Sequence, residues 1–255
     1  MKHIIENIKK TFRLSFSLAV AQFKLRNEGS YLGIFWYLLD PLAMFSIILI
    51  LSGVLTNTNI KNYPVYLLLG LIMFNFFRQT TINSTNSIVA NAAFIKSMKI
   101  SSEVFVISVA IQSFFSHLFE LVILLFFIIF FKIPLIGFFL YPAVFLFLFL
   151  FSLGASFILA SIGVYVNDIN NVWSVFINIL WFSTPIFYVI SDGGPAIINK
   201  LNPMFYFVSI AREIVIGGSI FPTGQLIEIA VLSVIFFLSG LVIFEKFKTK
   251  FAELI

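Results

Sequence analysis

The chain has 255 residues, of which 60% are hydrophobic and 11% are charged, and its mean hydropathy is +1.07. This composition excludes an ordinary soluble domain and predicts a single all-α, polytopic membrane domain over residues 1–255. The formal charge of +5 favours the positive-inside pattern of membrane proteins over a nucleic-acid-binding surface. The absence of cysteine excludes disulfides and thiolate–metal sites.

Residues 1–30 are expected to form an interfacial region, with a helix over residues 2–25 that lies on the membrane. Its apolar residues are spaced by three and four, so they fall on one arc of a helix. They are Ile5, Ile8, Phe12, Phe16, Ala19 and Phe23. The opposite side is basic, which is typical of helices in the headgroup plane. A solvated cytoplasmic helix is the alternative, disfavoured by Leu14, Leu18 and Val20 on the polar side.

Six apolar stretches follow, each long enough to cross the roughly 30 Å hydrocarbon core of a bilayer. We place the spans at residues 33–55, 64–88, 104–131, 136–166, 172–190 and 225–245. Spans one to five thus occupy residues 33–190, and residues 225–255 hold span six and a cytoplasmic tail. The fourth span is too long for a straight crossing and must tilt, bend near Gly154 or extend beyond the lipid. In the segment 191–224, residues 203–216 are predicted to form a short amphipathic or re-entrant helix.

The distribution of lysine and arginine predicts that both termini are cytoplasmic. With the N terminus inside, eleven of the sixteen basic residues lie in inside segments and four lie in outside segments. The remaining one, Arg78, lies within span two. The segment 191–224 is therefore expected to be extracytoplasmic.

The chain contains no G-x-x-x-x-G-K-[ST] phosphate loop, so we expect no ATP hydrolysis and no catalytic residue in it. His117 and Glu120 lie three residues apart in span three, at a depth where ionisable groups usually have a function. The alternative, which we favour, is a structural pair that holds the bundle together. Two ligands are too few for a metal site.

The polar half of span two begins at Arg78 and reads RQTTINSTNS. Ten such residues cannot all face lipid, so they face a water-filled passage, a partner subunit or other helices. We favour a passage or a subunit interface over ordinary interhelical hydrogen bonding.

The segment 91–103 between spans two and three is predicted to be a cytoplasmic loop with a short helix. Ser101 and Ser102 are expected to cap span three, and Glu103 to lie favourably in its first turn. The loop is either a plain connection or a lever that receives force from a soluble partner. The candidate coupling residues are Phe94, Ile95, Lys96, Ser97, Met98, Lys99 and Ile100.

The order of these features resembles the permease subunits of type-two ABC exporters, in particular those that export lipid-linked polysaccharides such as O antigen, capsule or teichoic acid. The motif at the start of span one comprises Arg26, Ser30, Leu32, Gly33, Trp36 and Pro41. The family pattern S-P-I-x-Y…N-P…R is matched by residues 184–188, Asn202, Pro203 and Arg212. The chain departs from the family at Asn27, where tyrosine is frequent, and at Asn167, where arginine is frequent.

The resemblance implies that two copies of this chain form the pore and that two separate ABC ATPases bind ATP and Mg²⁺, with no cofactor in this chain. It places the protein in the cell membrane, which is the inner membrane in a Gram-negative bacterium. Residues 94–100 would couple to the ATPase. Pro185, Asn202, Pro203 and Arg212 would form an extracytoplasmic gate, and the substrate would be a lipid-linked polysaccharide.

A conduit for a sugar chain requires aromatic faces and hydrogen-bonding groups rather than rings of charge. The candidate pathway residues are Trp36, Arg78, Trp181, Phe187 and Tyr188. Trp173 and Trp181 share one stripe of span five. Trp173 lies next to the inner loop and fits an interfacial anchor, whereas Trp181 lies about nine residues, roughly 13 Å, into the span and fits the passage.

Three other functions are considered from the sequence: the permease of a drug or small-lipid ABC exporter, an intramembrane lipid-modifying enzyme that uses His117 and Glu120, and a scaffold subunit without a pathway. Permeases of the first kind usually lack the compact chain and the span-one motif. The enzyme would lack a nucleophile and a metal set.

We predict that an Asp192→Cys variant reacts with a membrane-impermeant maleimide in intact cells, because this position is outside in the topology above. Asn59→Cys should react in the same way. The chain has no native cysteine, so each label reports one position. Reaction of Asp192→Cys in broken cells alone would contradict the topology.

Overall fold

A computed structural model describes residues 2–28, 33–55, 62–98, 100–188, 201–218 and 223–255. Across these residues every regular element is a helix, which confirms the all-α class. The elements are α1 (Lys2–Asn27), the 3₁₀ helix η1 (Gly33–Phe35), α2 (Trp36–Leu55), α3 (Tyr63–Thr85), η2 (Val89–Asn91), α4 (Ala92–Met98), α5 (Glu103–Phe130), α6 (Ile136–Tyr165), α7 (Ile169–Ser183), α9 (Pro203–Val215), α10 (Thr223–Phe247), η3 (Lys248–Lys250) and α11 (Phe251–Leu254).

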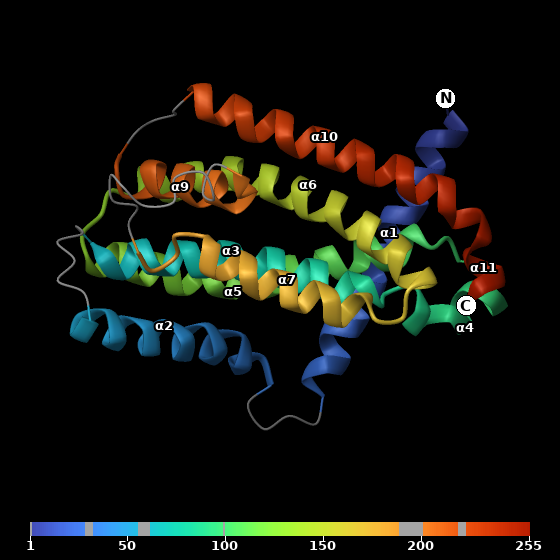
Figure 1. The fold of residues 1–255 in the computed structure, drawn as a ribbon, viewed down its shortest axis with the longest axis horizontal. Helices are drawn as coiled ribbons and strands as arrows, with labels where there is room; N and C mark the ends of the chain where they lie inside the picture. The colour runs from blue at the N-terminus through green and yellow to red at the C-terminus, as the bar shows by residue number, and fades with distance from the viewer. Residues whose placement is uncertain (1, 29–32, 56–61, 99, 189–200, 219–222) are drawn as a thin grey trace.

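The long helices form one bundle, and α1 crosses it at a steep angle (Figure 1). In the described part of the chain, four stretches are long and apolar enough to cross a membrane: α3, α5, α6 and Gly224–Leu254. They coincide with predicted spans two, three, four and six, in agreement with a multi-pass membrane protein. α2 holds a shorter apolar stretch, Leu38–Leu51, and α7 has 15 residues. The count of six crossings stays a prediction.

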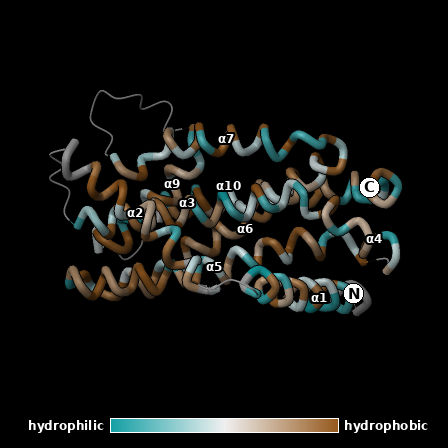
Figure 2. The backbone as a smooth tube through the Cα atoms, turned by 90° about the horizontal axis from the view of Figure 1, so that it is seen from below, coloured by the Kyte–Doolittle hydropathy of each residue, from teal (hydrophilic) through white to brown (hydrophobic). Residues whose placement is uncertain are grey.

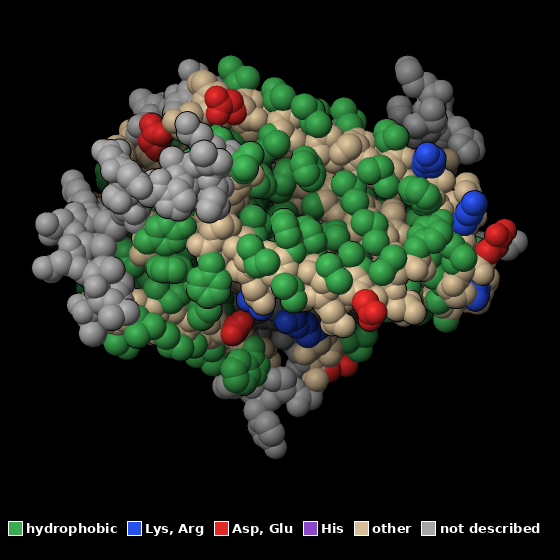
Figure 3. Space-filling model, in the orientation of Figure 1, with side chains coloured by type: hydrophobic (Ala, Val, Ile, Leu, Met, Phe, Trp, Pro, Cys, Tyr) green, Lys and Arg blue, Asp and Glu red, His purple; other side chains and the backbone are tan. Residues whose placement is uncertain are grey.

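Apolar side chains cover much of the outside of the bundle. Figure 2 shows long hydrophobic stretches along α5 and more hydrophilic residues at the end where α4 and the C terminus lie. In Figure 3, hydrophobic side chains fill the middle of the visible face, and charged side chains lie mostly toward its margins. Such a surface suits contact with lipid or with another subunit.

α6 packs along both α10 and α3. It is one uninterrupted helix, so Gly154 does not break it. Gly154 instead lies where α6 meets α10, because a Cβ at Gly240 would stand 2.3 Å from the carbonyl oxygen of Gly154. Glycine at both positions lets the two backbones approach closely, as small residues do in other membrane helix pairs.

The predicted fifth span, 172–190, is wrong at its far end, because α7 stops at Ser183. Thr184 has an extended backbone, since the ring of Pro185 disfavours a helical conformation in the residue before it. The Thr184 hydroxyl donates to the carbonyl oxygen of Leu180 at 2.7 Å and closes the last turn. α7 is therefore roughly 22 Å long, shorter than a full crossing.

The helix predicted at residues 203–216 is confirmed as α9, which ends at Val215. It packs against α3, α6 and α10, and most of its side chains are buried. Residues 191–200 and 219–222 of the predicted gate segment lie outside the described residues, as do the last two residues of predicted span five.

The N-terminal helix is confirmed over almost the predicted range, and its apolar arc is used in two ways. The rings of Phe16 and Phe23 contact Phe115 of α5 edge-on, with centroids 5.9 and 5.7 Å apart. Ile8 and Phe12 are 63% and 59% exposed. The arc thus attaches α1 to the bundle and leaves apolar side chains for a membrane surface. That α1 lies in the membrane surface stays a prediction.

Candidate functional site

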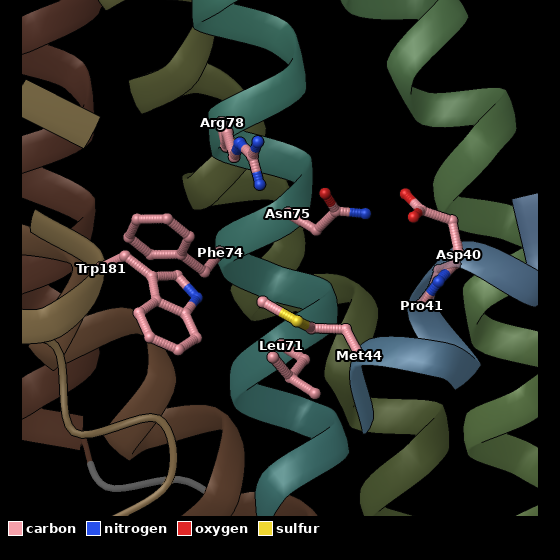
Figure 4. Close-up of a pocket in the computed structure, with 8 residues that line it drawn as sticks. All are labelled: Asp40, Pro41, Met44, Leu71, Phe74, Asn75, Arg78 and Trp181. Carbon is pink, nitrogen blue, oxygen red and sulfur yellow. The ribbon is translucent and has the colours of Figure 1, made fainter. Parts of the chain in front are cut away.

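Residues of α2, α3 and α7 line a groove, which Figure 4 shows in close-up. We call this set the groove: Asp40, Pro41, Met44, Leu71, Phe74, Asn75, Arg78 and Trp181. Two predicted pathway residues, Arg78 and Trp181, come from different helices and are brought together here. That substrate moves along the groove is still a prediction.

The groove combines apolar surface with hydrogen-bonding groups. Its four α3 residues recur at spacings of three and four, so they share one face of that helix. In Figure 4, Trp181 of α7 lies on one side and Asp40 of α2 on the other, with Asn75 and Arg78 of α3 between them. Sequence reasoning missed Asn75, since a single asparagine within a span belongs to no pattern.

The aromatic pathway candidates after α7 continue from Trp181. The ring of Phe187 lies 5.4 Å from Trp181, and the ring of Tyr188 lies 5.3 Å from Phe187, between centroids. Trp36 is separate from this row: it is 54% exposed at the start of α2 and does not line the groove.

Within the span-one motif, Ser30 and Leu32 lie outside the described residues. Arg26 is in the last turn of α1, where a cation interacts favourably with the helix dipole. Gly33 opens η1 with a φ of 45°, in the left-handed region that favours glycine. Pro41 lies in α2 and lines the groove. The motif therefore shapes the junction between α1 and α2 and contributes to the groove.

The 184–188 turn that follows α7 is held by Arg212 of α9. This arginine is 7% exposed, and its Nη1 and Nη2 donate to the carbonyl oxygens of Pro185 and Ile186 at 2.6 and 2.7 Å. Its Nε donates to the carbonyl oxygen of Tyr66 on α3 at 3.0 Å. The guanidinium lies 3.4 Å from the centre of the Tyr66 ring. One side chain thus joins α9, α3 and the turn, using the planar fork that lysine lacks.

Gly70 makes room for this arginine. A Cβ at Gly70 would stand 2.7 Å from the Arg212 Nη2 atom and 3.2 Å from the side chain of Ile186. Any larger residue at position 70 would therefore displace the guanidinium or the turn.

The remaining predicted gate residues converge on the same turn. The side-chain oxygen of Asn202 accepts from the backbone nitrogen of Met204 at 2.9 Å and caps α9, whose first residue is Pro203. Its Nδ2 donates to the Thr184 hydroxyl at 2.8 Å. Pro185, Asn202, Pro203 and Arg212 therefore form one structural unit, although their role as a gate stays a prediction.

Two tyrosines of α3 complete this unit and were missed by sequence reasoning. The hydroxyl of Tyr63 donates to the carbonyl oxygen of Phe187 at 3.0 Å. The hydroxyl of Tyr66 donates to the carbonyl oxygen of Tyr188 at 3.1 Å. Their partners lie more than 120 residues away in the chain, so no local pattern could have indicated them.

The candidate coupling segment contains α4, but its residues differ in access. Phe94 and Met98 are 45% and 65% exposed, and Lys96 and Ser97 are exposed too. Ile95 is buried in a cluster with Phe244 and Phe251, and Ile100 packs against that cluster. The hypothesis that Ile95 contacts a soluble partner is therefore wrong, since the chain's own C-terminal helices cover it. Lys99 lies outside the described residues.

α5 begins at Glu103 as predicted, but the predicted serine cap is wrong. Ser102 precedes the helix in a helical conformation and makes no capping hydrogen bond through its side chain. Ser101 instead donates to the carboxylate of Glu103. The same carboxylate accepts from the Lys248 Nζ at 2.8 Å, which ties the start of α5 to η3.

The polar half of α3 is mostly buried within this chain. The hydroxyls of Thr80, Thr81 and Ser84 donate to carbonyl oxygens of the preceding turn at 2.7–2.8 Å. For these three residues the structure favours ordinary hydrogen bonding over a passage. Arg78 is exposed in the groove, and there the passage or interface hypothesis is retained.

His117 and Glu120 are buried and bonded to each other, which supports their structural pairing, with His117 Nδ1 and Glu120 Oε2 3.0 Å apart. Among the described residues, no group of three or more histidine, aspartate or glutamate side chains could hold a metal ion.

The chain matches the description of ABC-2 type transporters over residues 13–216 and belongs to that family. It is 24% identical to an O-antigen export system permease protein RfbA of Myxococcus xanthus, over 99% of both chains. It is 26% identical to two proteins of the same name from Klebsiella pneumoniae, over 98% of this chain and 97% of each relative. The family is one of membrane transporters, and these relatives are named as permease proteins of O-antigen export systems.

We predict that Arg212→Met lowers the stability of the folded chain by about 3–5 kcal/mol, because it leaves the buried carbonyl oxygens of Pro185 and Ile186 without donors and breaks the link to Tyr66. The measurement is the Tm of the detergent-solubilised protein. Arg212→Lys should recover part of the loss, since an ammonium cannot reach three carbonyls in fork geometry. Lys246→Met, at an exposed position of α10, is the control and should leave the Tm unchanged. An unchanged Tm for Arg212→Met would contradict the prediction.

Proposed function

We propose that this chain is the membrane-spanning subunit of an ATP-driven exporter that moves a lipid-linked polysaccharide, of O-antigen, capsule or teichoic acid type, from the cytoplasmic side across the cell membrane. Membership of the ABC-2 family supports the transport role. The names of relatives that match nearly the whole chain support the substrate class. The observation that carries the proposal is the groove between α2, α3 and α7.

The groove suits a sugar chain because a sugar ring has apolar faces and hydroxyl-bearing edges. The indole of Trp181 offers a flat apolar face for a ring to stack on. Asn75, Asp40 and Arg78 offer a neutral amide, an acceptor and a donor for hydroxyl groups. A ligand site of this kind is mainly apolar with a few placed polar groups.

Membership of the ABC-2 family supports a partner ATPase, and the rest of the assembly is part of this proposal. Two copies of this chain form the pore and two separate ATPase subunits, which bind ATP and Mg²⁺, drive it. α2, and α7 together with the 184–188 turn that extends it, complete six crossings, and both termini are cytoplasmic. The exposed side chains of α4 face the ATPase, and the 184–188 turn with α9 forms the extracytoplasmic gate. In a Gram-negative cell the complex lies in the inner membrane.

We predict that Trp181→Ala lowers the amount of polysaccharide on the cell surface about 3- to 10-fold, the equivalent of one aromatic stacking contact. The measurement is quantitative labelling of surface polysaccharide, normalised to the amount of permease in the membrane. Trp181→Phe keeps an aromatic face and should retain most export. Ile179→Ala, on the same helix but 63% exposed, is the control. Unchanged export in Trp181→Ala would refute the groove as the pathway.

The exposed and the buried side of α4 are predicted to respond differently to an introduced charge. Met98→Asp should leave the stability of the isolated permease within about 0.5 kcal/mol of wild type, because the side chain is exposed. It should nevertheless reduce co-purification of the ATPase, because it puts a charge into the docking surface. Ile95→Asp should lower the stability of the permease itself by about 3–5 kcal/mol, because it buries an unpaired charge. Full retention of the ATPase by Met98→Asp would mean that α4 is a plain connection.

A further inference from the structure

A buried hydrogen-bonded network lies behind the groove and joins α6, α5 and α3. His117 and Glu120 of α5 are 1% and 2% exposed, and His117 Nδ1 lies 3.0 Å from Glu120 Oε2. The His117 Nε2 lies 3.0 Å from the hydroxyl of Tyr141 on α6. The other carboxylate oxygen of Glu120 accepts a hydrogen bond from Nδ2 of Asn75 on α3.

Rings on both sides hold this network in place. The imidazole of His117 stacks on Phe145, with centroids 4.3 Å apart and planes 6° apart, and lies 5.6 Å from the ring of Phe76. Tyr141 is itself fully buried. Close packing of this kind leaves His117 and Glu120 one arrangement, so the carboxylate stays at a fixed place beside α3.

Of the four residues in the network, Asn75 also lines the groove. A carboxylate only accepts hydrogen bonds, so the contact with Glu120 requires the Asn75 amide nitrogen to face it. That contact fixes the orientation of the amide and leaves the Asn75 Oδ1 as an acceptor on the other side. Figure 4 shows the amide beside Arg78 and opposite Asp40.

Stability alone does not explain such a network. Ionisable groups inside a membrane bundle are costly, and apolar side chains of similar volume often serve stability equally well. A positioned amide in a groove is a benefit that apolar side chains could not supply. A pre-oriented acceptor also gives up less conformational entropy on binding than a freely rotating one.

We propose that His117 and Glu120 are positioning residues for Asn75, whose Oδ1 accepts a hydrogen bond from a sugar hydroxyl of the polysaccharide in the groove. The inference deepens the proposed function and rests on it. Asn75 is the residue that touches substrate, and Glu120 acts through it.

The test uses the complex of permease and ATPase in liposomes. ATP hydrolysis is measured against increasing amounts of lipid-linked polysaccharide extracted from the cells that produce this chain. Asn75→Ala should raise the KM for the polysaccharide about 3- to 10-fold and change the maximal rate less than about twofold, as expected for one lost hydrogen bond in binding. Glu120→Leu should raise the KM by a similar factor. The double variant should raise it no further, because both changes remove the same contact.

Two further variants test positioning against a merely structural role. Glu120→Gln keeps an acceptor oxygen for the Asn75 amide and should restore part of the wild-type KM. Ser152→Ala removes a buried α6 hydroxyl that bonds only within its own helix, at 2.7 Å from Leu148 O, and should leave the KM unchanged.

The outcomes distinguish the two proposals. If the polysaccharide stimulates the wild-type complex and Asn75→Ala has the same KM as wild type, the role of Asn75 is overturned while the proposed function stands. Additive effects of Asn75→Ala and Glu120→Leu overturn the positioning role of Glu120. A polysaccharide that fails to stimulate the wild-type complex overturns the proposed function and this inference together. Asn75→Ala tests the contact with substrate. Where Glu120→Leu fails to assemble, Glu120→Gln tests the positioning role, and a KM no nearer to wild type than that of Asn75→Ala overturns it.

Discussion

The guanidinium of Arg212 is the contact on which the arrangement of α3, α7 and α9 depends. Backbone carbonyls outside a helix are costly at membrane depth, because lipid supplies no donors. Arg212 supplies donors to Pro185 and Ile186 and, through a third hydrogen bond, ties both to Tyr66. The end of α7, and with it the groove wall that carries Trp181, is therefore fixed relative to α3.

Hydropathy predicted well those helices whose position is set by residues close to each other in the sequence. The four long membrane helices and α9 lie close to the predicted ranges, since each has a long apolar run or, for α9, the Asn202–Pro203 start signal. The end of α7 was missed because the apolar run continues past Pro185 through Ile186 and Phe187, and so concealed the proline stop. Ile95 was misassigned because its cover comes from Phe244 and Phe251, about 150 residues further along the chain.

The candidate site was predictable in part. Arg78 and Trp181 each stood out, as a charge and a tryptophan deep in an apolar stretch, and the fold places them in one groove. Asn75 could not be found in this way, because its importance comes from hydrogen bonding to Glu120 on another helix. The role of Tyr66 could not be predicted either, since a tyrosine near the start of a span is usually an ordinary interfacial residue.

The attachment of α7 has a mechanical consequence. One end of the helix is clamped through the 184–188 turn. The other end is held too, because residues 166–168 join Ile169 directly to α6 and the Thr85 hydroxyl of α3 donates to the side-chain oxygen of Asn170 at 3.3 Å. Between the two ends, Ile177 and Leu180 are the described residues of α7 that are buried. α7 therefore resembles a beam supported at both ends and lightly packed between them. A sideways load would bend the middle of this helix, while Trp181, next to the clamp, would keep its place beside α3.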